Sequence, residues 1–427
     1  MKVVYRAAVL MGAAVVVLGS SAFAASTSDA PTFTKDVLPI LQENCLDCHR
    51  PATVGTSGMV APMSLTTYEE VRPWSKAIAK AVQARYMPPW FASHDFSGVF
   101  RNERSLSDNE IATIAKWSET GAKRGNPADA PAPLTFETKE WWVGEPDLIV
   151  QLPEPVWVGD DVQDWQPNID IPLTADMLPE DRWIRAIECV PGNTEIVHHI
   201  VLYKKSEGPG GFGQNIGGLA PGSEPSLIQD GYGILLEKGS ILNANMHYHK
   251  EAGPGTGAYD QSRLGFHFYP KGQEIKPIHI APIGNMDFEI PPGRAAWTVG
   301  MAQSFDKSFK ILSYLPHMHL RGVKAEYVAH YPDGKTEHLL DVPAYDYNWQ
   351  LNYEYAQAKS FPAGTRIEAK MWFDNSTANV SNPDPNKSIR FGIETTAEMA
   401  LAWMYYTIDG EEGATSDYKV EEPASTD

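Results

Sequence analysis

A Cys-x-x-Cys-His motif near the N-terminus is the most specific chemical signal in the sequence. Cys45 and Cys48 enclose two residues, and His49 follows directly. This is the pattern of c-type haem attachment, in which both thiols form thioethers with the haem and the histidine reaches the iron from one side. A thioredoxin-like redox pair would use the same cysteines, but no βαβ pattern surrounds them. Cys189 is the third cysteine, so no pair remains for a disulfide in the mature chain.

A methionine downstream of this motif is expected to be the sixth ligand of the haem iron. Met87 is the preferred candidate, because the two prolines that follow it would hold the chain rigid just after the sulfur. Met63 and Met59 are alternatives, and His94 is a further one.

The remaining chemistry lies in three histidine clusters within strand-like segments. They are His198-His199, His247-Tyr248-His249 and His317-Met318-His319. Successive residues of a strand point to opposite faces, so an H-x-H strand offers two nitrogens on one face. Adjacent histidines can share a metal only where a bulge or strong twist rotates one of them. Buried imidazoles without partners are costly, and three such clusters in one chain favour metal binding over a structural role.

The chemistry of these residues favours copper. No carboxylate lies within the clusters and no second cysteine is free, which disfavours magnesium, calcium, manganese and a zinc thiolate site. Imidazoles with a thioether suit copper, because soft sulfur stabilises Cu(I) while nitrogen also accepts Cu(II). Zinc on three histidines remains a rival at the first cluster.

The segments around the haem motif have helical periodicity. Apolar residues recur at helical spacing in residues 33–44 and 68–85, and a capping box at Ser107 opens a third helix that ends at Gly121. This order of elements resembles a small class I cytochrome c over residues 29–126. The resemblance implies a small all-α cytochrome c domain at the start of the mature chain.

Beyond a Pro/Ala linker at residues 127–136, the periodicity becomes that of strands. Alternating segments separated by Gly and Pro turns predict two consecutive antiparallel β-sandwiches. The first is expected over residues 137–290 and the second over 291–412, with an acidic tail at 413–427. The fold class is therefore expected to be multi-domain, with a small all-α cytochrome c domain followed by two antiparallel β-sandwich domains.

Residues 137–412 resemble the copper type II, ascorbate-dependent monooxygenases, which include peptidylglycine α-hydroxylating monooxygenase and dopamine β-monooxygenase. The resemblance rests on Val197-His198-His199, Asn245-Met246-His247-Tyr248, His317-Met318-His319-Leu320, and Glu398-Met399 leading to Met404-Tyr405-Tyr406. It implies two jelly-roll-like sandwiches and two copper ions. The electron-transfer copper would be bound by His198, His199 and His247. The copper that activates O2 would be bound by His317, His319 and Met399.

This family hydroxylates an unactivated C–H bond with O2, and the resemblance implies the same reaction on a small organic substrate here. The covalent haem would relay electrons to the first copper from an external donor, either ascorbate-like or a redox protein. Leu315 stands where the peptide-processing enzyme has an arginine, and Trp403 where it has a tyrosine, which argues against peptide amidation and for a more apolar pocket. His249 has no counterpart in the family. The alternative is a non-catalytic haem and copper protein that transfers electrons or binds copper, and a haem-bearing subunit of a larger assembly is a third possibility.

The N-terminus has the features of a secretory signal peptide. In residues 1–24, a short basic region with Lys2 and Arg6 precedes an apolar stretch. Small residues typical of a cleavage site follow the stretch. The stretch is shorter than the roughly 20 residues that span a bilayer, so no membrane span is expected in the mature chain. The formal net charge of −19, without a dense run of Lys or Arg, argues against a nucleic-acid partner. The expected location is periplasmic or secreted.

Overall fold

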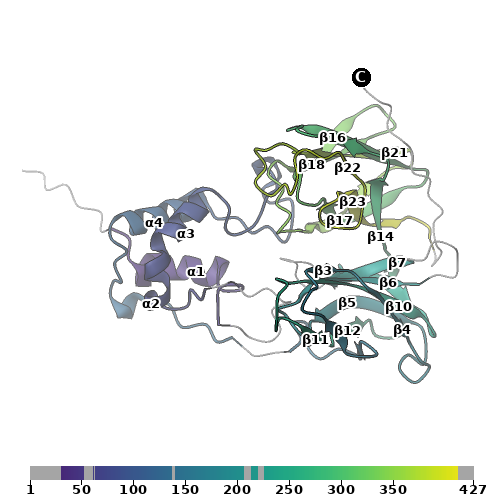
Figure 1. Cartoon of the computed structure of the whole chain (residues 1–427), viewed down its shortest axis with the longest axis horizontal. Helices are drawn as coiled ribbons and strands as arrows, with labels where there is room; N and C mark the ends of the chain where they lie inside the picture. The colour runs from purple at the N-terminus through teal and green to yellow at the C-terminus, as the bar shows by residue number, and fades with distance from the viewer. Residues whose placement is uncertain are drawn as a thin grey trace, which may run out of the picture.

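The computed structural model describes residues 30–51, 61, 63–136, 140–205, 213–219 and 226–411 of the 427-residue chain. Figure 1 shows helices at one end of the molecule and two stacks of strands at the other. The predicted signal peptide and acidic tail lie outside the described residues, as does Met59. No described helix combines the length and the apolar character needed to cross a membrane.

Short helices come first in the chain. Their bounds are α1 Leu38–Asn44, α2 Tyr68–Val71, α3 Ser75–Gln83 and α4 Asp108–Glu119. The expected capping box opens α4, since the Ser107 hydroxyl accepts from the Glu110 N–H and the Glu110 carboxylate accepts from the Ser107 N–H. The single helix expected over residues 68–85 is divided into α2 and α3 by a 3-10 turn at Arg72–Trp74, where Pro73 lacks an amide hydrogen.

The expectation of a small all-α cytochrome c domain over residues 29–126 is wrong. Strands make up 39% of the structure and helices 13%. Between α3 and α4 the chain leaves the helical core, and Trp90, Phe96 and Phe100 pack against the core of the second sandwich. Phe100 also forms an isolated β-bridge with Tyr355. Because each aromatic ring hides a large apolar area when buried, this segment is held on the sandwich rather than in a separate helical unit.

The first sandwich has two sheets around one apolar core. One sheet has the order β1-β12-β5-β9-β13, with β8 paired to β5, and its strands are β1 Leu148–Gln151, β5 Arg182–Val190, β8 Ser226–Leu227, β9 Tyr232–Leu236, β12 Arg263–Phe268 and β13 Lys276–Pro277. The other has the order β3-β10-β6-β7, with β4 paired to β10, and its strands are β3 Asp164–Trp165, β4 Asn168–Pro172, β6 Val197–Lys204, β7 Gln214–Leu219 and β10 Ile241–His249. A separate ribbon pairs β2 Val156–Val158 with β11 Ala258–Asp260.

The second sandwich has two four-stranded sheets. One has the order β14-β23-β17-β20, and its strands are β14 His279–Asn285, β17 Phe309–His317, β20 Tyr353–Phe361 and β23 Ala400–Ile408. The other has the order β16-β21-β18-β19, and its strands are β16 Trp297–Phe305, β18 Gly322–His330, β19 Thr336–Val342 and β21 Thr365–Phe373. A ribbon pairs β15 Glu289–Ile290 with β22 Ile389–Arg390. The β-sandwich part of the expected fold is compatible with this architecture.

The sheet that contains β14, β17 and β23 packs on both cores. Ile283 of β14 lies in the core of the second sandwich, whereas Ile280 of the same strand lies in the core of the first. Leu312 of β17 also lies in the first core, and Trp403 and Tyr405 of β23 pack against it. The second sandwich therefore begins at β14, before the boundary expected at residue 290, because alternate residues of this strand serve the two cores.

Candidate metal centres

Two adjacent histidines and a third on the neighbouring strand form the first candidate centre. β6 and β10 are antiparallel, with His199 opposite His247 and Val197 opposite Tyr248. The register shifts between these pairs, so His198 is the extra residue of a β-bulge. The bulge brings His198 to the face that His199 and His247 share, which is what adjacent histidines need if they are to bind one metal.

The ring nitrogens of these three histidines converge. Nδ1 of His199 lies 3.2 Å from Nδ1 of His198 and 3.2 Å from Nδ1 of His247. Two nitrogens that bind one tetrahedral metal at about 2.0–2.1 Å lie about 3.3–3.4 Å apart, so the observed spacing fits a metal ion. Three histidines supply three positions of such a centre and leave the fourth open.

Burial keeps these imidazoles neutral, which is the form that binds a metal. Burial and the neighbouring His247 and His249 lower the pKa of His198 to about 4. Burial also lowers the pKa of His199 well below its usual value. The pKa of His247 is lowered by burial as well, although the nearby Asp164 carboxylate opposes this shift. At neutral pH, protons therefore compete weakly with a metal for these nitrogens.

Asp164 of β3 holds the far side of His247. Its Oδ2 lies 3.1 Å from Nε2 of His247 and 3.5 Å from Nδ1 of His249, and it accepts a 3.1 Å hydrogen bond from Thr395. Burial would raise the pKa of Asp164, but interactions with His247 and hydrogen bonds from His247, Thr395 and His249 lower it. A carboxylate behind a histidine fixes its tautomer and leaves the other nitrogen, here Nδ1, as the ligand atom. His249 lies beside the centre, next to the same carboxylate.

The second candidate centre lies at the end of β17. The rings of His317 and His319 have centroids 5.3 Å apart and are nearly perpendicular. Nδ1 of His317 donates to Oε1 of Gln350 at 2.7 Å, and Nδ1 of His319 lies 3.3 Å from the backbone oxygen of Ala397. With both Nδ1 atoms engaged, Nε2 is the atom that each ring presents to a metal. Burial lowers the pKa of His317, and burial together with His317 lowers that of His319 to about 3.

Glu398 ties this centre to Met399. Its carboxylate accepts hydrogen bonds from the backbone N–H of His319 at 2.8 Å, of Arg321 at 2.7 Å and of Met399 at 3.3 Å. Burial raises the pKa of Glu398 to about 7, although these N–H groups and the Arg321 guanidinium act against the rise. The buried carboxylate therefore holds the H-x-H turn against the segment that carries the methionine. His317, His319 and Met399 fit the set of two imidazoles and one thioether expected for copper.

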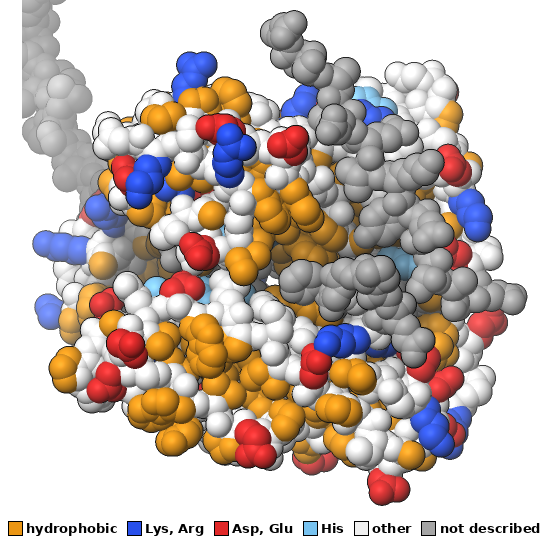
Figure 2. All heavy atoms as spheres, turned by 45° about the vertical axis from the view of Figure 1, so that its right-hand side comes forward, with side chains coloured by type: hydrophobic (Ala, Val, Ile, Leu, Met, Phe, Trp, Pro, Cys, Tyr) orange, Lys and Arg blue, Asp and Glu red, His pale blue; other side chains and the backbone are white. Residues whose placement is uncertain are grey.

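Ligand residues of both centres meet at one cavity of about 540 Å³ between the sandwiches. His199 of the first centre lines it, as do His317, His319 and Met399 of the second. Leu315 and Trp403, the two departures from the peptide-processing enzyme, also line it, together with many aliphatic side chains. On the face drawn in Figure 2, hydrophobic side chains gather around a hollow in the middle of the molecule. The cavity gives a bound molecule apolar surroundings close to both candidate centres.

The haem motif forms a turn directly after α1. The N–H of Cys45 donates to the oxygen of Leu41, and the N–H of His49 donates to the oxygen of Cys45, each at 2.9 Å. Neither Cys45 nor Cys48 forms a disulfide, as c-type attachment requires. Nδ1 of His49 lies 3.2 Å from the backbone oxygen of Met63, which leaves Nε2 for the iron. Nε of the neighbouring Arg50 is buried without a hydrogen-bond partner among the described residues, a donor that a haem propionate would satisfy.

The two candidate axial methionines occupy different places. Met63 lies on the His49 side, since its backbone oxygen holds the histidine ring. Met87 lines a second cavity, of about 770 Å³, between the helical segment and the second sandwich. None of Cys45, Cys48 and His49 lines that cavity, so the structure does not bring Met87 to the haem motif, and Met87 as the axial ligand stays a prediction. His94, the least favoured alternative, also lines the second cavity.

Three residues position the histidines in ways that the sequence analysis did not predict. Asp164 lies in a two-residue strand, Gln350 in a loop, and Glu398 in a segment whose contact with the H-x-H turn depends on the fold. The absence of carboxylates within the clusters, which favoured copper, therefore holds for the sequence but not for the structure. Asp164 faces Nε2 of His247, away from the converging Nδ1 atoms, so the candidate ligand atoms of the first centre remain imidazole nitrogens.

No protein-family model matches this chain, and no curated protein matches it. Among solved structures, the chain is similar at 10% identity to one in the cryo-EM structure of Broad Bean Stain Virus, over 62% of this chain and 90% of that one, with a TM-score of 0.28. It is also similar at 10% identity to the N-terminal CBM22-1-CBM22-2 tandem domain of Paenibacillus barcinonensis Xyn10C, over 62% and 98% of the two chains, with a TM-score of 0.13. Similarities this low carry no argument, so the centres are interpreted from their own geometry.

Proposed function

We propose that this chain is an exported monooxygenase that uses two copper ions and one covalent haem to hydroxylate a C–H bond of a small, neutral and apolar substrate with O2. The observation that carries the proposal is the shared cavity. His199 of the first candidate centre lines it, and so do His317, His319 and Met399 of the second. An isolated three-histidine site would not need a second ligand set facing the same apolar space.

Copper would supply one-electron storage at the first centre and O2 activation at the second. The residues of the chain do the rest. Asp164 and Gln350 fix the tautomers of His247 and His317, so each ring offers a defined nitrogen. Glu398 fixes the backbone on both sides of the second ligand set. Met399 offers soft sulfur, which favours Cu(I), the oxidation state that binds O2.

The lining of the cavity supports a neutral substrate. Among the described lining residues, the only charged side chains are Arg104 and Glu354. Glu354 is paired with Arg101, and Arg104 also has a partner. Leu315 and Leu401 lie near the ligand histidines in place of a cation or an acid that could hold a charged substrate. A carboxylate or an ammonium group would enter this space unpaired, which is costly.

Two electrons from outside are needed for each hydroxylation, and the haem motif offers the entry point. Three features suit a covalent haem: Cys45 and Cys48 form no disulfide, the His49 ring is held through Nδ1, and the buried Nε of Arg50 has no hydrogen-bond partner among the described residues. The donor to this haem is an ascorbate-like reductant or a redox protein. The signal-like N-terminus and the haem motif both support export to the periplasm or beyond.

Metal content and O2 consumption test the proposal. The full-length mature protein is expected to hold one haem and two copper ions per chain, and His247→Ala is expected to lose one copper. His330→Ala is the matched control, because His330 is a partly exposed histidine of β18 paired with Glu368. With reductant, O2 consumption should rise with toluene and not with benzoate or benzylamine. Two coppers without substrate-dependent O2 consumption would instead support the non-catalytic electron-transfer protein, and a protein that binds no copper would refute both.

A further inference from the structure

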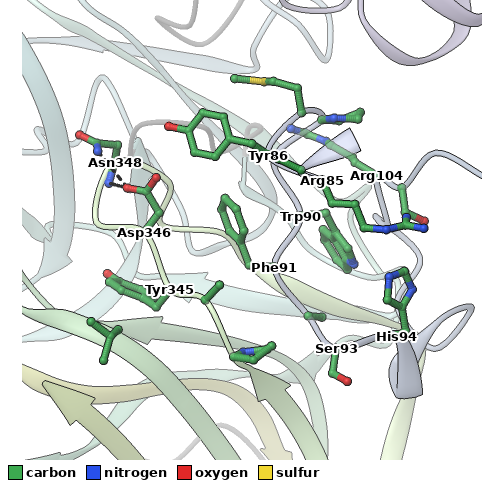
Figure 3. Close-up of a pocket in the computed structure, with 18 of the residues that line it drawn as sticks. Arg85, Tyr86, Trp90, Phe91, Ser93, His94, Arg104, Tyr345, Asp346 and Asn348 are labelled. Atoms are coloured by element: carbon green, nitrogen blue, oxygen red, sulfur yellow. Dashed lines mark hydrogen bonds between the residues drawn. The ribbon is translucent and has the colours of Figure 1, made fainter. Parts of the chain in front are cut away.

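Tyr347 lies in the loop that joins β19 to β20, next to a cavity and to both candidate metal centres. It lines the 770 Å³ cavity that Met87 also lines. Figure 3 shows Tyr345, Asp346 and Asn348 of the same loop across this cavity from Arg85 and Arg104. The loop is therefore placed between the segment that follows α3 and the two candidate copper centres.

The ring of Tyr347 contacts one ligand histidine of each centre. It stacks on His198, with ring centroids 6.4 Å apart and planes 14° apart. It meets His319 edge-on, with centroids 6.1 Å apart and planes 85° apart. One aromatic side chain thus bridges the space between a ligand of the first sandwich and a ligand of the second.

The position of Tyr347 is held from both sides. The hydroxyl of Tyr345 donates to the backbone oxygen of Met318 at 2.8 Å and accepts from its N–H at 3.1 Å, which ties the loop to the H-x-H turn. The Tyr347 hydroxyl is hydrogen-bonded to Thr395, which in turn donates to Asp164. Burial raises the pKa of Tyr347 to about 12, so the phenol stays protonated at neutral pH.

We propose that Tyr347 is the electron-transfer bridge between the first copper centre of this protein and the second. This inference rests on the proposed function. Electron tunnelling is faster through packed atoms than across an open or water-filled gap, and the Tyr347 ring is the packed path between His198 and His319. In each step one electron leaves a reduced metal and arrives at an oxidised one. The ring itself is neither oxidised nor reduced, no proton moves, and the external donor restores the haem.

Two variants separate the ring from the hydroxyl. Tyr347→Leu removes the aromatic path, whereas Tyr347→Phe keeps the ring and loses only the hydrogen bond to Thr395. Tyr331→Leu is the matched control, because Tyr331 packs against the same sandwich core and hydrogen-bonds Glu337 without touching a candidate ligand. Full-length, copper-loaded protein is fully reduced under anaerobic conditions and mixed with O2 and toluene by stopped flow. Oxidation of the haem is followed, because its electron reaches O2 through the first copper and then the second. Copper content and the Cu(II) EPR spectrum are recorded for each variant.

Tyr347→Leu is expected to slow haem oxidation severalfold with unchanged copper content and EPR spectrum, while Tyr347→Phe and Tyr331→Leu keep the wild-type rate. Wild-type haem oxidation in Tyr347→Leu would overturn the inference and leave the proposed function intact. A Tyr347→Phe variant as slow as Tyr347→Leu, or an altered EPR spectrum in Tyr347→Leu, would also overturn it, because the residue would then act by positioning ligands. Failure of the wild-type protein to oxidise its haem through copper would refute the relay in the proposed function itself.

Discussion

Replacing Asp164 with asparagine tests whether the carboxylate behind His247 sets the metal affinity of the three-histidine centre. Asparagine keeps the shape of the side chain but removes the charge that stabilises the Nε2–H form of the ring. Loss of such a partner typically weakens metal binding by about 10- to 100-fold. The Asp164 side chain is 36% exposed, and water screens part of its charge, so the lower end of this range applies. The expected loss is about tenfold, equal to about 1.4 kcal/mol of binding free energy.

A competition titration with a copper chelator measures this loss for each centre. The second centre should keep its affinity, because its rings are held by Gln350 and by the backbone of Ala397 rather than by Asp164. Asp170→Asn is the control, since Asp170 lies in the same sheet and its carboxylate accepts hydrogen bonds from Asn243 and Lys205, neither of which is a candidate ligand. An unchanged affinity in Asp164→Asn, or an equal loss at both centres, would show that the carboxylate does not have this role.

Three further predictions concern single side chains. Met399→Leu should change the free energy of unfolding by less than about 1.5 kcal/mol, measured by urea denaturation, yet sharply lower reductant-dependent O2 consumption because the soft ligand is gone. Met87→Ala should remove the weak red absorption band of a Met–Fe(III) bond, and its persistence would exclude Met87 as the axial ligand. The free energy of unfolding of the metal-free protein should fall as pH drops from 6.5 to about 4, because over this range the unfolded chain protonates His198 and the folded chain does not. The pKa of Glu398, raised to about 7, has the opposite effect on the free energy of unfolding, because the folded protein then binds the extra proton. The test therefore compares urea midpoints between these pH values, and the midpoint of His198→Gln should change less with pH than that of the parent protein.

The alternation of residues in the sequence was sufficient to place the histidines of the first centre on strands. It was insufficient to predict the side chains that hydrogen-bond them. Alternation along residues 195–204 and 241–250 predicts two strands, and the structure has β6 and β10 there. The adjacent pair His198-His199 already requires a bulge or strong twist if both rings are to face one metal. The observed register shift at that point supplies it. Asp164 lies 83 positions before His247, in a strand too short to have a period, so its contact exists only once the sheet has formed.

At the helical end of the molecule, the sequence predicted the helical segments but not the domain organisation. The amphipathic pattern and the capping box at Ser107 are local, and α4 forms as they indicate. Whether the helices make an independent domain depends on where the aromatic residues between α3 and α4 are buried, and periodicity has no information on this. Trp90 and Phe100 lie against Tyr353, a residue more than 250 positions later in the chain, and this long-range packing decides the architecture.

The two candidate centres keep a fixed relation because the sheet that carries the second is packed on the core of the first sandwich. Relative motion of domains is the usual expectation unless their interface is large and apolar. Here Leu312 and Ile280 are buried in the core of the first sandwich, and Trp403 packs beside them. The hydrogen bond from Thr395 to Asp164 adds a polar tie next to the first centre. This packing also fixes the loop of Tyr347 beside both ligand sets, so the proposed electron transfer between the centres would need no domain movement.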